Sequence, residues 1–290
     1  MLTRFFHPLS LGLCLPGERR QPLSVQAVGS SFNPHLLTFT LECESGPLSA
    51  LDLPAAAVVA ERWREALVSC SNDLPAPARE VVSGHAANGE ALQVPHLAFL
   101  PLAFVGHPHA TGHLLGLALA LPRWVDRDTR RAVLRAVGRV EVLRLGRLGV
   151  WRLRRDAWAQ PPWNLRPEAW TAHPEGATHW ATVTPVSFDR HPKAKDRAQY
   201  QRELSEIIAT GCAAIGLPRP REVVVTHVSA HLGVPPAHVF PRLKRKDGSE
   251  RRHAHAILVF DEPVVGPVLI GAGRYRGYGV CRPMNAGATV

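Results

Sequence analysis

The sequence lacks the cysteine pairs and long apolar runs that several protein classes require. Its five cysteines are scattered and form no CxxC pair, which argues against a disulfide framework and a thiolate zinc site. No apolar run reaches the roughly eighteen residues of a membrane span. The start of the chain has no clean cleavage site of a signal peptide, so we expect a cytoplasmic protein without a membrane partner.

Several catalytic signatures are also missing. There is no Ser-His-Asp order, no Walker phosphate loop and no HExxH helix. The acidic residues are scattered, without the carboxylate cluster that two-metal nuclease chemistry needs. The aromatic signature of the RNA-recognition motif is absent as well. We therefore expect neither a metal ion nor a cofactor.

Acidic residues are in the minority. The chain has 34 Lys and Arg against 24 Asp and Glu, a formal net charge of +10, and most of its cations are arginines. The planar guanidinium fork suits phosphate oxygens, so this balance favours a polyanionic partner such as nucleic acid. A GC-rich genome, which inflates Arg, Ala and Pro together, is the other explanation.

The 290 residues, 46% of them hydrophobic, repeat one β-α-β-β-α-β pattern. The first copy has strands at 36–45, 96–105, 113–122 and 141–155, and helices at 54–70 and 126–140. The second has strands at 179–189, 221–230, 251–264 and near 278–283, a helix at 196–217, and a short helix within 264–272. This order predicts an α+β protein of two tandem ferredoxin-like domains. We expect an arm at 1–35, domains at 36–158 and 178–290, and a linker at 159–177.

A glycine-rich loop, GAGRYRGYGVCR at 271–282, precedes the last strand. Glycine allows positive φ and close approach of a ligand, and free amides can cradle phosphate oxygens. Arg274 and Arg276 add charge, while Tyr275 and Tyr278 can stack on bases. The predicted RNA-binding residues here are Gly271, Gly273, Arg274, Tyr275, Arg276, Gly277 and Gly279. An ordinary glycine-rich turn is the alternative.

Histidines gather at two places. His107, His109 and His113 crowd one short turn, and His253 and His255 lie two apart on a predicted strand, so they share a face. An imidazole titrates near neutrality and can move a proton to or from a ribose hydroxyl. Surface histidines or an adventitious metal site would also explain the first group, and a hydrogen-bonded, partly buried side chain would explain His255.

Basic side chains form two further groups. The segment 240–252 predicts a hairpin tip, and DRHPKAK at 189–195 precedes the long helix. Such clusters contact phosphates, although a solvated charged hairpin is the alternative. The candidate RNA-binding cations are Lys193, Lys244, Arg245, Lys246, Arg251 and Arg252.

These motifs resemble a known family. Paired ferredoxin-like domains with a glycine-rich loop before the last strand resemble the RAMP superfamily of CRISPR-associated proteins. More closely, HLAFLPLAFVGHPHATGHLLGLALALPR, VTPVSFDRHPK and HAHAILVFDEPVVGPVLIGAGRYRGYGVCRP resemble the Cas-five/Cas-six fusion protein of type I-G (I-U) systems, the GSU-type family, over roughly residues 36–290. Its members carry a further amino-terminal domain, so we expect residues 1–35 to be a remnant or replacement of it.

The resemblance implies a metal-independent endoribonuclease that processes the CRISPR repeat transcript. A ribose 2′-OH attacks the adjacent phosphorus and leaves a 2′,3′-cyclic phosphate and a 5′-OH. By position in the matched motif, His109 is the expected catalytic residue, with His107 and His255 as rivals. Repeat RNA and other subunits of a type I effector complex are the implied partners.

Two other functions stay open at this point. The chain can be a non-catalytic subunit that binds CRISPR RNA within an effector complex. It can also be a metal-dependent hydrolase that uses His107, His109 and His113, in which case it would hold stoichiometric zinc.

Overall fold

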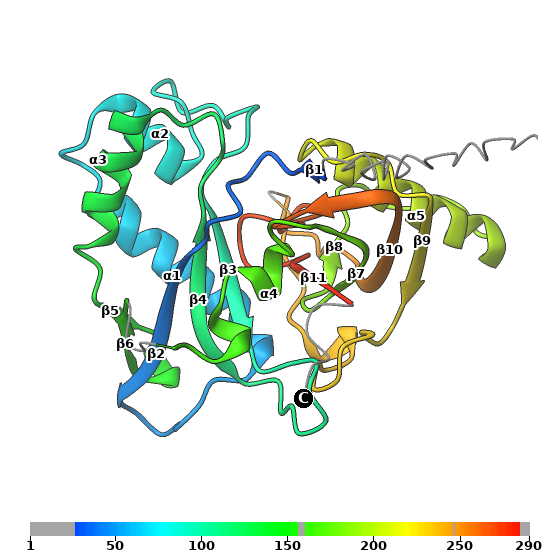
Figure 1. Ribbon diagram of the computed structural model, residues 1–290, viewed down its shortest axis with the longest axis horizontal. Coiled ribbons are helices and arrows are strands. Elements are labelled where there is room, and N and C mark those ends of the chain that lie inside the picture. Colours follow the sequence, from blue (N-terminus) through cyan, green and yellow to red (C-terminus); the bar gives the residue numbers. More distant parts are fainter. Residues whose placement is uncertain (1–26, 156–159, 246, 285–290) are drawn as a thin grey trace, which may run out of the picture.

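The computed structural model describes residues 27–155, 160–245 and 247–284. Figure 1 shows two halves side by side, each built on one curled sheet; the first is coloured mainly blue to green and the second mainly green to red. In the described part of the chain, no helix has the length and apolar character needed to cross a bilayer.

The first half has the strand order of a ferredoxin-like domain. Its sheet runs β3-β4-β2-β6-β5, with every neighbouring pair antiparallel. The four strands of the β-α-β-β-α-β pattern are β2, β3, β4 and β6. Numbered 1 to 4 along the chain, they lie side by side in the sheet in the order 4-1-3-2. The strands are β2 (Leu37–Ser45), β3 (Ala98–Ala103), β4 (Leu114–Ala120), β5 (Val142–Arg144) and β6 (Val150–Arg154), and the helices are η1 (Leu53–Ala55), α1 (Ala56–Ser69), α2 (Ala76–Ser83), α3 (Arg127–Val137) and η2 (Gly146–Leu148).

The second half repeats this order without its second helix. Its sheet runs β1-β10-β7-β11, and β9 also pairs with β10, so β7, β9, β10 and β11 again lie in the order 4-1-3-2. The strands are β1 (Val28–Gly29), β7 (Ala177–Thr182), β8 (Val186–Ser187), β9 (Glu222–Thr226), β10 (His253–Val265) and β11 (Cys281–Pro283), and the helices are α5 (Arg197–Ala213) and η4 (Ala237–Val239). The chain is thus two tandem ferredoxin-like units.

Three predictions about individual elements were wrong. No helix lies within 264–272: β10 extends to Val265, and residues 266–280 reach β11 without forming a helix. The segment 141–155 is a β5–β6 hairpin, because Gly146 and Gly149 take positive φ and turn the chain. The expected strand at 179–189 divides into β7 and β8.

Two aspartates fix where the long helices begin. The Asp126 side chain accepts hydrogen bonds from the amides of Asp128 and Thr129 and caps α3. Asp196 caps α5 in the same way through the amides of Ala198 and Gln199. A carboxylate that accepts from free first-turn amides stabilises a helix by about 0.5–2 kcal/mol. Both caps lie at the first residue of the helices that the sequence predicted.

Tryptophans are buried in both halves of the molecule. Trp63 of α1 is fully buried and makes edge-on contacts with Phe39 and Phe99, at centroid distances of 5.3 and 5.4 Å. Trp170 and Trp180 are equally buried near the connection between the halves. That connection contains η3 (Trp163–Leu165) and α4 (Glu168–Thr171), and α4 lies between the two halves in Figure 1.

The glycine-rich loop joins the halves directly. Arg276 forms an isolated β-bridge with Phe99 of β3. A side chain at Gly277 would lie 3.3 Å from the Ala56 carbonyl and 3.4 Å from Pro101, so the loop backbone lies close against the first half. This contact places loop residues beside α1 and the start of β3.

Gly279→Ala is expected to destabilise the protein strongly. Gly279 has a φ of +64°, and an added Cβ would lie 1.8 Å from the Ile270 carbonyl oxygen. The left-handed backbone costs about 1–2 kcal/mol for alanine, and the overlap adds roughly 1–3 kcal/mol. Urea denaturation measures the sum. Gly89→Ala is the matched control, since Gly89 has a φ of +83° with nothing within 4 Å; equal losses in the two variants would contradict the packing shown for the loop.

Candidate functional site

The glycines of the loop allow its backbone to pack closely against other parts of the chain. Gly271, Gly273, Gly277 and Gly279 are buried, and a Cβ at Gly271 would lie 2.4 Å from the Ser187 carbonyl. The amides of Ala272, Arg274, Arg276, Tyr278 and Gly279 donate to carbonyls of the chain itself. These amides already donate hydrogen bonds within the protein. The sequence had predicted free amides that could bind phosphate oxygens, and these five are not free.

The loop's tyrosines have different roles. Tyr278 is fully buried, and its hydroxyl donates to the Pro241 carbonyl, so the expectation that it stacks on bases was wrong. Burial raises its pKa. Tyr275 is partly exposed and faces the first half.

The two arginines of the loop also differ. Arg274 turns inward: its Nη1 donates to the Gly271 carbonyl at 2.9 Å and lies 3.5 Å from Asp189, and its guanidinium carbon is 5.0 Å from the Tyr275 ring centroid. Arg274 therefore holds the loop in shape. Arg276 is exposed, so it is the loop arginine that can contact a ligand.

A basic pocket of about 270 Å³ forms where the loop meets the first half. Arg64 from α1, together with His85 and His96 from the segment before β3, line one side. Lys244, Arg245 and Arg251 from the basic hairpin line another, and Tyr275 and Arg276 complete it. None of the described lining residues is acidic. We call this site the basic pocket.

Its cations lie close enough to repel one another. The Arg64 guanidinium donates to the Ser83 carbonyl, and burial, followed by the charge of Arg276, lowers the pKa of Arg64. Burial and then Arg245 lower the pKa of Arg251, which donates to the Phe188 and Asp189 carbonyls at 3.0 Å. An anion among these groups would relieve the repulsion, and a phosphate has the oxygens that guanidinium forks bind.

His96 is clamped at the edge of this pocket. Its ring stacks on Tyr275 at 3.6 Å between centroids, and Gly84 lies so close that an added Cβ would be 2.6 Å from Nε2. Nδ1 is buried without a hydrogen-bond partner, so Nε2 is the nitrogen left for a ligand. Burial, and then the charge of Arg64, lowers the pKa of His96 to about 4. The ring is neutral at pH 7 and can accept a proton.

The turn between β3 and β4 carries His107, His109 and His113, and we call it the histidine hairpin. It lies away from the basic pocket. His107 and His109 follow β3, whereas His96 precedes it, and the six residues of β3 span roughly 20 Å. In Figure 1 the turn between β3 and β4 lies at the lower end of these strands. The structure therefore does not bring His107 or His109 to the basic pocket.

The metal interpretation finds no support in this hairpin. Among the described residues, no three His, Cys, Asp or Glu side chains are grouped as a metal site would require. His107, His109 and His113 therefore do not form such a group.

The histidines of β10 are held inside the second half. His255 is fully buried, with Nδ1 3.0 Å from the Thr182 hydroxyl and Nε2 3.1 Å from the Pro235 carbonyl, and burial lowers its pKa to about 4. Both ring nitrogens are engaged, which matches the structural alternative for this residue. His253 Nε2 similarly bonds the Ala237 carbonyl at 2.8 Å.

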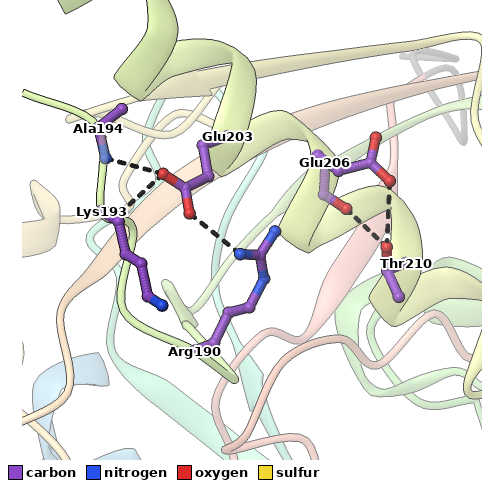
Figure 2. Close-up of polar contacts among 6 residues, drawn as sticks. All are labelled: Arg190, Lys193, Ala194, Glu203, Glu206 and Thr210. Atoms are coloured by element: carbon purple, nitrogen blue, oxygen red, sulfur yellow. Dashed lines mark hydrogen bonds and ion pairs between the residues drawn. The ribbon is translucent and has the colours of Figure 1, made fainter. Parts of the chain in front are cut away.

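Two of the predicted basic residues, Arg252 and Lys193, do not line the basic pocket. Arg252 lies beside Arg251 in sequence but points toward α5, where it donates to the Tyr200 hydroxyl at 3.1 Å. Lys193 is exposed, and Figure 2 shows its side chain extending away from Glu203, whose carboxylate accepts the Lys193 amide and Arg190. Lys246 lies outside the described residues.

Comparison with known proteins decides the family. Residues 45–283 match the CRISPR-associated protein, GSU0054 family. The chain belongs to this family. No curated protein matches the sequence significantly.

Solved structures similar to this GSU0054-family chain share little sequence with it. A Cas6-related gene product from Pyrococcus furiosus aligns with a TM-score of 0.43 and 9% identity, over 87% of this chain and 99% of that one. A structure titled CRISPR associated protein Cas6 aligns with a TM-score of 0.44 and 12% identity, over 86% and 98%. A RAMP protein described as binding different RNA substrates aligns with a TM-score of 0.42 and 13% identity, over 85% and 98%.

Sequence reasoning missed Arg64, His85 and His96 of the GSU0054-family chain. Arg64 is one of many arginines on a predicted helix, His85 lies between the predicted elements, and His96 is the first residue of the strand predicted at 96–105. Gly84 is the one local sign, since a glycine next to His85 permits the turn, with a φ of +74°, that brings the backbone against His96.

Gly84→Ala is expected to displace the His96 ring from Tyr275. The added methyl would overlap the ring, and alanine disfavours the φ of +74°. The released imidazole should gain solvent, so its pKa should rise from about 4 toward the ordinary 6.5. An NMR titration of the ring, assigned with His96→Gln, measures this change, and Gly89→Ala is the control. An unchanged titration in Gly84→Ala would contradict the clamp.

Proposed function

We propose that this protein binds CRISPR repeat RNA at the basic pocket and cleaves it without a metal ion. One observation carries the proposal: five cations and no carboxylate line a pocket that also contains a neutral, clamped histidine. Membership of a CRISPR-associated family supports repeat RNA as the ligand. The likeness stated from the sequence adds the finer proposal that the chain works in a type I-G effector complex and retains its product there.

The bound RNA would follow basic side chains out of the pocket. Arg245 Nη2 lies 3.3 Å from His191 Nδ1, and His191 leads to Arg190 and Lys193 at the start of α5. Lys244, Arg251 and Arg276 would contact phosphates inside the pocket, with Lys193 outside it. Because these contacts are mainly electrostatic, affinity should fall with rising salt.

The chemistry needs a base, a charged cradle and an acid. In the proposed reaction, His96 Nε2 takes the proton of a ribose 2′-OH, and the 2′-oxygen attacks the neighbouring phosphorus. The P–O5′ bond breaks, which leaves a 2′,3′-cyclic phosphate, and the departing 5′-oxygen takes a proton from His85 or from water. Arg64 and Arg276 would stabilise the additional negative charge of the phosphorane.

His96 replaces His109 as the favoured histidine in this proposal. His109 is exposed at the far end of β3, away from the cations that would hold the reacting phosphate. His255 has both ring nitrogens bonded inside the second half. His96 alone among these three lines the basic pocket.

Incubation with repeat RNA in excess EDTA tests the proposed function. Cleavage should persist, and the upstream product should end in a 2′,3′-cyclic phosphate. A repeat with a 2′-deoxy nucleotide at the cut should bind and stay intact. Tight, salt-sensitive binding without cleavage of the normal repeat would instead favour a non-catalytic CRISPR RNA-binding subunit, and dependence on added metal would contradict the mechanism.

The pH dependence of cleavage follows from the lowered pKa of His96. The base form is present above the pKa, so kcat/KM, which reports the free enzyme, should stay high down to about pH 5 and fall as pH approaches about 4. Arg64, Arg274 and His85 face the ring and oppose its protonation. A base with the ordinary pKa of about 6.5 would already lose roughly tenfold at pH 5.5. That earlier loss would argue against His96.

A further inference from the structure

A second pocket, of about 420 Å³, lies at the histidine-hairpin end of the contact between the halves. Phe104 and His107 follow β3, Trp163 and Asn164 come from η3, and Arg282 comes from β11. Arg166 also lines it. We call it the aromatic pocket; the proposed cleavage chemistry does not use it.

Arg282 is a buried cation without an acidic partner. Its residue is 4% exposed, and its Nη1 and Nε donate to the Val105 and Ala169 carbonyls at 2.8 and 3.3 Å. No carboxylate of a described residue contacts it, and burial lowers its pKa to about 10, so it is charged at neutral pH. A buried charge is costly unless it is paired, so a ligand with an electronegative edge would be stabilised here.

Asn164 adds a fixed amide beside this cation. Its side chain is buried at 6% exposure, and Nδ2 donates to the Ala103 and Val105 carbonyls at 3.1 and 2.9 Å. These two bonds orient the amide, so that Oδ1 is the atom able to accept a hydrogen bond from a ligand. The floor of the pocket thus offers one cationic donor and one neutral acceptor.

The walls are flat and partly exposed. The Phe104 and His107 rings lie 5.7 Å apart at an interplanar angle of 29°, and Trp163 is 37% exposed. Arg166 is exposed, and its Nε donates to the Pro161 carbonyl, which fixes the start of its guanidinium. Flat aromatic walls with few oriented polar groups suit a planar, polar ring, and aromatic side chains in such sites stack on nucleobases.

We propose that the aromatic pocket binds a single unpaired nucleotide. The base would lie against Phe104, His107 and Trp163, with a ring carbonyl on the Arg282 guanidinium, the group that reads guanine O6 and N7 in other settings. Bases with a carbonyl should bind more tightly than adenine, which has none. This gives the histidine hairpin a role in base contact, and the inference does not depend on whether the chain cleaves RNA.

Calorimetric titration of the full chain with 5′-GMP, 5′-UMP and 5′-AMP tests the inference. We expect GMP and UMP to bind more tightly than AMP. Trp163→Ala should weaken GMP binding about tenfold, since stacking on an aromatic ring is lost. Arg282→Gln should weaken it at least as much; circular dichroism checks that this buried variant folds, and the exposed Trp163 variant tests the pocket regardless.

Two controls separate this inference from the proposed function. Trp124→Ala removes another exposed tryptophan, 49% exposed, outside the aromatic pocket and should leave GMP binding unchanged. Arg276→Ala, in the basic pocket, should weaken repeat RNA binding and leave the preference for GMP over AMP unchanged. Absence of binding by all three nucleotides at millimolar concentration, or equal binding by wild type and Trp163→Ala, would overturn the inference.

Discussion

His96→Ala is expected to lower the rate constant of repeat cleavage by roughly 10²–10⁴-fold, the usual contribution of a positioned acid–base side chain. Nε2 of His96 is the ring nitrogen left for a ligand in the basic pocket, and the neutral ring is ready to take a proton. The cations that hold RNA remain, so affinity should change little. Single-turnover cleavage and filter binding of the same RNA measure the two quantities separately.

Alanine variants of two other histidines, His109 and His85, show whether the loss of cleavage is specific to His96. His109→Ala removes an exposed imidazole at the other end of β3 and should leave the cleavage rate within about twofold of wild type, because surface changes away from a site have small effects. His85→Ala should give an intermediate loss if His85 protonates the leaving oxygen, and no loss if water does. A large loss in His109→Ala with normal cleavage in His96→Ala would restore the assignment made from the sequence motif.

Neutralising the basic pocket should give the largest loss of affinity. In the triple variant Arg64→Gln, Arg245→Gln and Arg276→Gln, three phosphate-binding cations are removed from a site without acidic lining residues. Each lost phosphate contact reduces the slope of log affinity against log salt by roughly 0.7–0.9, so the slope should fall by about two to three. Binding of repeat RNA measured at several KCl concentrations gives this slope.

A second triple variant with the same change of net charge shows whether the salt slope depends on the basic pocket or on the net charge of the protein. Arg62, Arg139 and Arg219 are exposed and each is paired with a carboxylate, of Glu65, Asp73 and Glu206 respectively. Replacing these three with glutamine changes net charge by the same amount but removes no proposed phosphate contact. The salt slope should then stay near the wild-type value. Equal slopes in the two triple variants would show that RNA responds only to overall charge, and the basic pocket would lose its role.

Most of the fold was predictable because its signals are local. Acidic residues followed by basic ones marked α3, apolar residues at helical spacing marked α5, and alternating apolar residues marked β2. The short apolar run after β10 was wrongly taken as a helix, since four to eight apolar residues do not separate a helix from a buried extended segment. The paired sheets followed from the order of the elements.

The site was predictable only in part. The loop and basic hairpin were found because glycines and cations are concentrated in each, yet the glycines contact Ser187 and Ile270 of the chain itself. Arg64 and His96 reach this loop from about 180–210 residues earlier. A local sequence pattern cannot predict a contact between residues so far apart in the chain. The histidine hairpin gave the strongest local signal for chemistry, but β3 separates it from the basic pocket.

An experimental structure with repeat RNA, carrying a 2′-deoxy nucleotide at the cut so that it stays intact, tests the basic pocket most directly. The phosphate at the cut should lie within hydrogen-bond distance of the Arg64 and Arg276 guanidiniums, with the adjoining ribose C2′ next to His96 Nε2. A cut-site phosphate bound beside His109, or on a surface away from the glycine-rich loop, would contradict the function proposed for this pocket.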